Sequence, residues 1–256
     1  MKTIFILFLL LINFCALGQS NTLSDLIKDR KRASVSFEKT DSSLDIGKKA
    51  PILLGSGFLI KKSNKIYGIT NAHVAKAIKN KERILIGINT NFGKFYGLVY
   101  LLKIEENKDI AIFSYFGNIL NPKHIIDTIK WDQQSVGISV IAKDEDILEG
   151  NEVISIGYPL HIGATSVKND PIIRRGIIAQ KDQGNGTFIL DGMSNPGNSG
   201  SPVFDVNTGD LIGMIRSYPQ DFISAYDEHG NLIVNLPYNS GLTTCITAYE
   251  ILKLIP

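Results

Sequence analysis

The sequence has 256 residues, with 27 Lys and Arg against 25 Asp and Glu, which gives a formal net charge of +2 at pH 7. Hydrophobic residues make up 44% of the chain and charged residues 20%. This composition supplies a core for one large or two small domains and excludes a collagen, a coiled coil or a disordered chain. The basic residues are scattered, so we expect no nucleic-acid partner.

The N-terminus is typical of a secretory signal peptide. Lys2 precedes an apolar run at 4–12, and the small residues Ala16 and Gly18 follow it. The run is shorter than the ~20 apolar residues that span a bilayer, which argues against a stable membrane anchor. We therefore predict a signal peptide at residues 1–18 and a secreted or periplasmic mature chain.

Removal of that segment would leave one cysteine, Cys245, in the strand-like run 242–247. A single cysteine excludes an intramolecular disulfide, so the domain must be held together by core packing. In such a run a lone cysteine is more often a small buried residue than a nucleophile.

The mature chain begins with a polar arm at 19–32, in which residues 24–30 could form a short helix. From Ala33 onward, short β-branched and aromatic runs alternate with Gly, Asn, Asp and Pro, which favour turns. We expect strands at 35–37, 65–70, 83–88, 96–102, 110–115, 153–156, 177–180, 187–191 and 211–215. This pattern predicts an all-β fold of two packed barrels or sandwiches.

Only the C-terminal segment has a helical pattern. Thr247 is a candidate N-cap, and Glu250 follows three residues later, which is the spacing of a capping box. We predict a helix over 247–255 that closes the domain.

The stretch 195–204 carries the strongest functional signal. Gly197 and Gly200 flank Ser199, so a tight turn could present its hydroxyl. Gly197 allows the dihedrals that aim two successive N–H groups into one hole, and Gly200 leaves room for a substrate carbonyl. Taken alone, the segment could equally be a glycine-rich hairpin turn.

A serine nucleophile needs a base, and His73 is the candidate because it follows the expected strand 65–70 and would be rigidly placed. The other histidines, His124, His161 and His229, lie in polar or turn-like surroundings typical of solvent-facing side chains. Asp109 opens an apolar run and could orient the imidazole. Its alternative role is to cap a turn.

These motifs resemble those of the chymotrypsin-like serine endopeptidases. The matching segments are GSGFLI at 55–60, TNAHV at 70–74, KDIA at 108–111 and GNSGSP at 197–202, in the order His, Asp, Ser that this family uses. The chain most resembles the bacterial exported branch of HtrA-type and glutamyl-endopeptidase-type enzymes, over about residues 33–255.

The resemblance implies a fold of two packed six-stranded antiparallel β-barrels with a C-terminal helix. The peptidase domain would span 33–256, with a first barrel at about 33–118, a second at about 134–246 and the helix at 247–255. Too few residues follow the second barrel to add a peptide-binding PDZ module.

By the same resemblance, Ser199 is the nucleophile, His73 the general base and then acid, and Asp109 the residue that orients it. The N–H groups of Gly197 and Ser199 would form the oxyanion hole. Substrates would be proteins or peptides, with no metal or cofactor, and the oligomeric state stays open. Asn198 stands where digestive relatives carry an aspartate that pairs with a freed N-terminus, so no activation cleavage is expected.

The resemblance also places a specificity pocket with its floor at Met193 and its wall at Ile215, Arg216, Tyr218 and Gly241. No carboxylate stands at the floor, which favours an uncharged apolar residue before the scissile bond. If Arg216 turned inward, it would favour an acidic one.

The sequence leaves one alternative function open and excludes another. A catalytically silent, protease-like peptide-binding module would keep the same fold and cleft. A lipase or esterase of the α/β-hydrolase kind is excluded, because the sequence around Ser199 lacks the final glycine of the nucleophile elbow and no alternation of strands and helices surrounds it.

Overall fold

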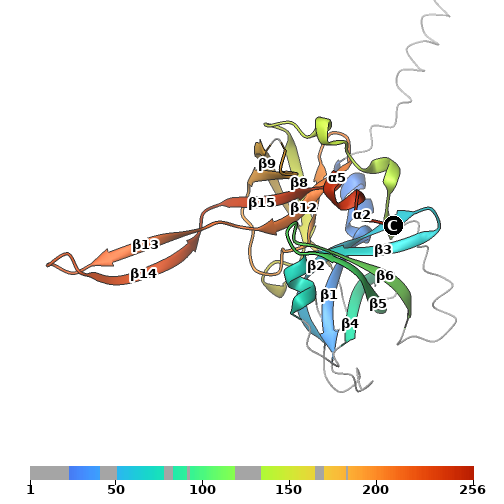
Figure 1. The fold of residues 1–256 in the computed structure, drawn as a ribbon, viewed down its shortest axis with the longest axis horizontal. Helices are drawn as coiled ribbons and strands as arrows, with labels where there is room; N and C mark the ends of the chain where they lie inside the picture. The colour runs from blue at the N-terminus through green and yellow to red at the C-terminus, as the bar shows by residue number, and fades with distance from the viewer. Residues whose placement is uncertain are drawn as a thin grey trace, which may run out of the picture.

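The computed structural model describes residues 23–40, 51–77, 83–90, 93–118, 134–164, 170–182 and 184–256. Within them the chain forms two antiparallel β-barrels followed by a C-terminal helix (Figure 1), which confirms the predicted fold class. The expected signal peptide at 1–18 lies outside the described residues.

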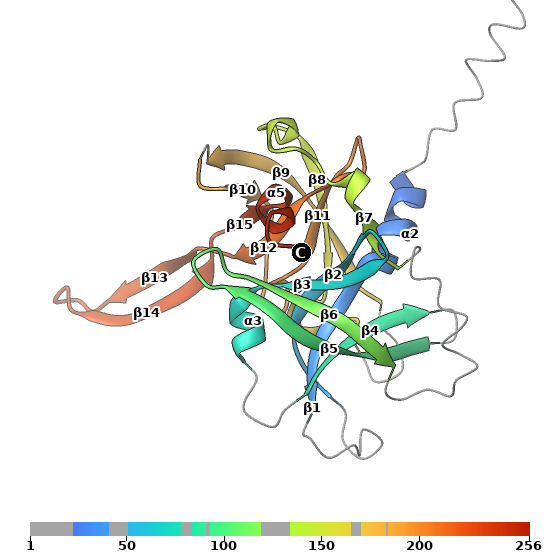
Figure 2. The same ribbon diagram turned by 45° about the vertical axis from the view of Figure 1, so that its right-hand side comes forward.

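Six strands close the first barrel in the order β1-β4-β5-β6-β3-β2, with β1 paired to β2. Figure 2 shows this barrel in the lower half of the view. A short strand, β7 (Val136–Gly137), adds in parallel to β2. The six strands are β1 (Ser34–Thr40), β2 (Ile52–Lys62), β3 (Lys65–Thr70), β4 (Arg83–Thr90), β5 (Gly93–Glu105) and β6 (Ile110–Asn118).

The second barrel is closed in the order β10-β15-β12-β11-β8-β9. Its strands are β8 (Glu152–Gly157), β9 (Ile172–Asp182), β10 (Thr187–Asp191), β11 (Pro202–Asp205), β12 (Leu211–Ser217) and β15 (Leu242–Thr247). Short 3₁₀ turns lie before or between these strands, at Ile138–Val140, Asp144–Asp146 and Pro159–His161.

Strand β2 packs on both of its faces, which ties the two barrels together. Leu59 points into the cluster inside the first barrel, whereas Phe58 and Ile60 join a cluster that also contains Phe204 and Ile246 of the second barrel. Successive residues of a strand point to opposite faces, so one strand serves both cores. This shared core fixes the junction at which the candidate site lies.

Among the described residues, three α-helices accompany the barrels: α2 (Leu23–Ala33), α3 (Ala72–Lys76) and α5 (Ala248–Leu252). The arm predicted as a short helix or a loose segment is helical from Leu23, and its Arg30 donates to the Gly209 carbonyl at 3.0 Å. In the described part of the chain, no helix combines the length and apolarity needed to cross a membrane.

The C-terminal helix is shorter than the predicted 247–255. Thr247 caps it by accepting a 3.4 Å hydrogen bond from the Glu250 N–H. The reciprocal half of the capping box is not formed, because the Thr247 N–H donates to Gly186 O and the Glu250 carboxylate binds Lys108 and Lys253. Beyond Leu252 the backbone continues as turns.

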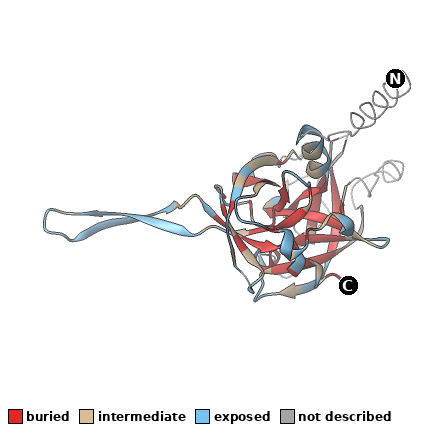
Figure 3. Cartoon of the chain, turned by 90° about the horizontal axis from the view of Figure 1, so that it is seen from above, coloured by how far each residue is buried: buried red, intermediate tan, exposed pale blue. Residues whose placement is uncertain are grey.

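A ribbon that the sequence did not predict projects from the second barrel (Figure 1). It consists of β13 (Gln220–Tyr226) and β14 (Leu232–Asn239), which pair with each other as a separate two-stranded sheet. Figure 3 shows it as a pale blue arm of exposed residues. Residues 220–239 fall inside the range expected for the second barrel, but they extend the β12–β15 connection outward instead.

Candidate active site

The loop between β10 and β11 holds Ser199 in a turn that only glycine permits at two positions. Gly197 has φ +95° and Gly200 has φ +90°. A Cβ at Gly197 would lie 2.3 Å from Tyr158 O, and one at Gly200 would lie 2.0 Å from Ser56 O. Any side chain at either position would therefore displace the turn.

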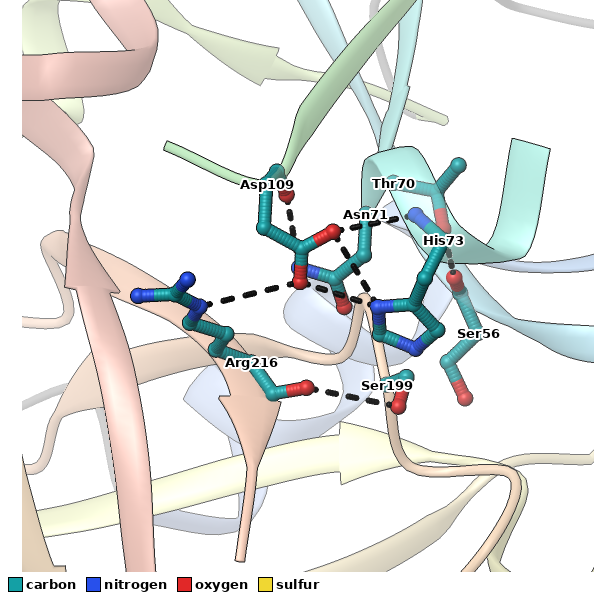
Figure 4. Close-up of polar contacts among 7 residues, drawn as sticks. All are labelled: Ser56, Thr70, Asn71, His73, Asp109, Ser199 and Arg216. Atoms are coloured by element: carbon teal, nitrogen blue, oxygen red, sulfur yellow. Dashed lines mark hydrogen bonds and ion pairs between the residues drawn. The ribbon is translucent and has the colours of Figure 1, made fainter. Parts of the chain in front are cut away.

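His73 and Asp109 meet on the first barrel, as Figure 4 shows. His73 Nδ1 lies 2.9 Å from Asp109 Oδ2, and the His73 backbone N–H donates to Asp109 Oδ1 at 3.0 Å. Asp109 thus holds His73 through both its imidazole ring and its backbone N–H. His73 stands in α3, just after β3, and not at the strand end itself.

Asp109 adopts a left-handed backbone conformation, with φ 56°. This conformation costs about 1 kcal/mol for a residue other than glycine, although aspartate tolerates it better than most residues do. The buried Asn71 holds it in place, because its amide donates to the Asp109 carbonyl at 3.1 Å. Asn71 was part of a sequence motif, but no positioning role was assigned to it.

Ser199 lies on the opposite side of the imidazole from Asp109. In Figure 4 the His73 ring stands between the two, with its second nitrogen toward Ser199. The Ser199 hydroxyl donates to the Arg216 carbonyl at 3.4 Å. The structure therefore brings His73 and Asp109 of the first barrel together with Ser199 of the second.

The N–H groups of Gly197 and Ser199 have no hydrogen-bond acceptor among the described residues. The turn around them is held by other bonds, from Asn198 N to Asn195 O at 3.0 Å and from Ser201 N to Asn198 O at 2.8 Å. Two N–H groups left open in one rigid turn can receive a ligand oxygen.

Ser56 of β2 links the first barrel to the nucleophile turn. Its hydroxyl donates to Gly197 O at 2.6 Å and accepts from Tyr158 N at 2.9 Å. Its backbone N–H donates to Ser199 O at 2.9 Å. No role was predicted for Ser56 from the sequence, where the only indication is a small hydroxyl residue between Gly55 and Gly57.

The residues predicted for the specificity pocket separate in the structure. Met193 and Ile215 line one narrow cavity of about 10 Å³, which has room for about one water molecule. Gly241 lies beside it, with its carbonyl accepting from Gly192 N at 3.0 Å, and the half-buried Tyr218 is not on its lining. The Arg216 guanidinium points to Asp109 instead, with Nε 3.8 Å from Oδ2.

Cys245 is fully buried in β15, and burial raises the pKa of its thiol well above the ordinary value. A thiolate nucleophile is disfavoured there. Within the described ranges, no group of three His, Cys, Asp or Glu side chains gathers as metal ligands.

A family of known proteins matches the part of the chain that carries these residues. Residues 55–214, more than half of the chain, match the family described as trypsin-like peptidase domain. The chain belongs to the trypsin-like peptidase family. The matched range includes His73, Asp109 and Ser199.

Individual relatives of this trypsin-like peptidase are more distant. "Protease Do-like 1, chloroplastic" from Arabidopsis thaliana is 29% identical over 163 residues, which cover 62% of this chain and 32% of that protein. HtrA-type protease AlgW, solved with a decapeptide, is 16% identical with a TM-score of 0.61 and covers 91% of this chain and 66% of its own. AlgW solved with a tripeptide is 17% identical with a TM-score of 0.58, and the match covers 91% of this chain and 62% of that one. The chain thus spans less than two thirds of each relative.

Proposed function

We propose that this trypsin-like peptidase is a serine endopeptidase that hydrolyses proteins or peptides through an acyl-enzyme intermediate. The observation that carries the proposal is the convergence of Ser199 and the His73–Asp109 pair at the junction of the barrels. A nucleophile, a base and the group that orients the base are the three parts that this chemistry needs.

In the proposed reaction, His73 Nε2 takes the hydroxyl proton as Ser199 Oγ attacks the substrate carbonyl. The Gly197 and Ser199 N–H groups stabilise the oxyanion, and each such donor contributes about 10² to 10³ in rate. The imidazolium then protonates the leaving amine, which departs, and the acyl group stays bound to Ser199. In the second half, His73 takes a proton from water as the water attacks the acyl group, and returns the proton to Ser199 Oγ as the acid product is released. Asp109 keeps the Nδ1–H in place throughout.

The proposal extends to substrate and location. Peptides bound in the AlgW structures support peptide substrates for this chain as well. The N-terminal pattern supports a signal peptide at 1–18, a peptidase domain at 33–256 and export to the periplasm or beyond. Asn198 is buried and carries no charge, which supports activity without a free N-terminus.

Labelling of the purified chain with a fluorophosphonate probe tests this function, with the modified residue mapped by mass spectrometry. We expect label on Ser199, lost in Ser199→Ala and His73→Gln and kept in Ser201→Ala, which removes a neighbouring buried hydroxyl. Peptide hydrolysis should fall by about 10⁴ or more in the first two variants. A folded wild-type chain that takes no label would instead be the silent binding module.

A further inference from the structure

The β13–β14 ribbon exposes apolar side chains on both of its faces. Cross-strand pairing places Ile223 opposite Leu236 on one face and Phe222 opposite Pro237 on the other. The exposed large side chains of the ribbon are Phe222, Ile223, Tyr226, Leu232, Ile233, Val234, Leu236 and Tyr238. An isolated two-stranded ribbon is marginally stable in water, and an apolar surface of this kind marks an interaction site.

The two edges of the ribbon differ. The β14 side carries Pro237, and the register between the strands shifts between Ala225 and Tyr226. Proline and irregular pairing are the devices that protect a sheet edge from another strand. Strand β13 contains no proline, lysine or arginine, so its edge has none of these side chains to keep a further strand away.

Hydrogen bonding shows which groups β13 offers at that edge. Pro237 has no N–H, and the Phe222 N–H is bound by Asp221 Oδ1 at 2.8 Å, so the pair Phe222–Pro237 does not exchange two ladder bonds. Residues along an antiparallel strand alternate between the two sides. The N–H and C=O groups of Phe222 and Ser224 therefore face the open edge.

We propose that this edge binds β13 of a second copy of the chain, antiparallel, with Ile223 opposite Ile223 of the other copy. The two seven-residue β13 strands then overlap along their whole length. Phe222 donates one backbone hydrogen bond to Ser224 of the second copy and accepts one from it. The Phe222 N–H leaves the Asp221 side chain for this bond. The two ribbons become one four-stranded sheet around a two-fold axis.

The charges of the ribbon fit this pairing. Residues 220–239 contain Asp221, Asp227 and Glu228 but no lysine or arginine. In the proposed register Asp221 faces Ala225, and Asp227 faces Pro219, three residues from Arg216, so no two carboxylates oppose each other. The same charge disfavours an anionic membrane as the partner, because such surfaces attract clustered lysine and arginine.

A matched pair of variants at Ser224 tests the dimer, in a Ser199→Ala background that prevents self-digestion. Light scattering after size exclusion should give twice the chain mass for this parent and for Ser224→Ala, which removes only the Ser224–Asn235 side-chain bond. Ser224→Pro removes the N–H that faces the open edge and breaks no backbone hydrogen bond between β13 and β14. This variant should give the mass of a single chain. A monomeric parent, or a dimeric Ser224→Pro, overturns the proposal.

Cysteine cross-linking tests the register. The background is Cys15→Ser, which leaves the buried Cys245 as the only native cysteine of the sequence. At a symmetric non-hydrogen-bonded pair the Cα atoms are about 4.5 Å apart, which suits a disulfide. Ile223→Cys should therefore form a covalent dimer under mild oxidation. Ile233→Cys is the control, because Ile233 lies on β14 and its exposed fraction, 67%, is close to the 61% of Ile223. No cross-link at 223, or an equal one at 233, rules out this pairing.

Discussion

Arg216 Nε lies 3.8 Å from Asp109 Oδ2, the same carboxylate oxygen that is 2.9 Å from His73 Nδ1. The carboxylate that orients the imidazole is therefore shared with a fixed cation, whose side chain is about one third exposed. The guanidinium helps to hold the carboxylate in the position from which it binds the imidazole. Arg216 is thus a positioning residue for the proposed base.

Replacement of Arg216 should lower kcat by loosening the Asp109 carboxylate. In Arg216→Ala, Asp109 Oδ2 loses a partner at 3.8 Å, so kcat should fall by about 3- to 10-fold with little change in KM. Arg216→Lys keeps a positive charge and should lower kcat less. An unchanged kcat in Arg216→Ala, measured by peptide hydrolysis, would show that the guanidinium does not position the carboxylate.

The turn of Ser199 should tolerate no side chain at Gly197. Gly197→Ala places a Cβ against the Tyr158 carbonyl and should lower kcat by about 100-fold or more by displacing an oxyanion donor. Gly150→Ala is the control, since Gly150 has φ +89° but nothing within 4 Å of an added Cβ. It should cost about 1 kcal/mol in stability, measured by urea unfolding, and leave kcat unchanged. Equal activity in both variants would contradict the proposed donor.

The strand predictions were most accurate for short β-branched and aromatic runs between turn residues. The expected strands 65–70 and 187–191 coincide with β3 and β10. The β13–β14 ribbon escaped prediction because apolar residues occupy both of its faces, which leaves no alternation. Helix α3 has only five residues, too few for a helical period, so His73 was placed at a strand end.

The candidate triad could be named from sequence because each residue stands in a local motif. Arg216 could not be placed in the same way. Its side chain turns toward Asp109 of the other barrel, and that direction depends on how the barrels pack. Ser56 and Asn71 likewise act through partners that are distant in the chain, so their roles became visible only in three dimensions.

A buried ion pair inside the first barrel should show strong coupling. The side chains of Glu38 and Lys94 are 3% and 1% exposed and bind each other, and burial lowers the pKa of Lys94 despite this partner. Glu38→Gln removes the buried carboxylate that binds the Lys94 ammonium and should destabilise the fold by about 3–5 kcal/mol. The double variant Glu38→Gln with Lys94→Met should recover most of that loss in urea unfolding. Additive losses would contradict the coupling.

Glu250 should make stability depend on acid pH. Burial alone would raise its pKa, but hydrogen bonds from Lys108 and Lys253 hold the pKa below the ordinary value of 4.5. A lowered folded-state pKa contributes stability that is present above the unfolded pKa and lost as pH falls through the folded one. Glu250→Gln should cost about 1 kcal/mol at pH 7 and much less near pH 3. Glu145→Gln, in an exposed pair with Lys143, should change little at either pH.

The cavity that Met193 and Ile215 share holds about one water molecule, so it must widen to admit a substrate side chain, and we expect its lining to decide which residue is cleaved. Its lining contains no carboxylate, and its two charged side chains are Arg174 and Arg175. A lysine or arginine of the substrate would enter next to like charges and without a counter-ion, which is costly in a narrow site. Cleavage after Lys or Arg should therefore be at least about 100-fold slower than after an uncharged residue.

We expect an uncharged apolar residue before the scissile bond, and a peptide-library digest tests this against an acidic one. Arg175 is engaged by Glu152, and Arg174 donates to the Met193 carbonyl at 3.0 Å, so neither guanidinium is fully open to a substrate carboxylate. If Glu were preferred nonetheless, Arg174→Ala and Arg216→Ala would identify the cation, because only one of them should abolish that preference. Cleavage mainly after Lys or Arg would contradict both specificities and the assignment of this cavity as the pocket.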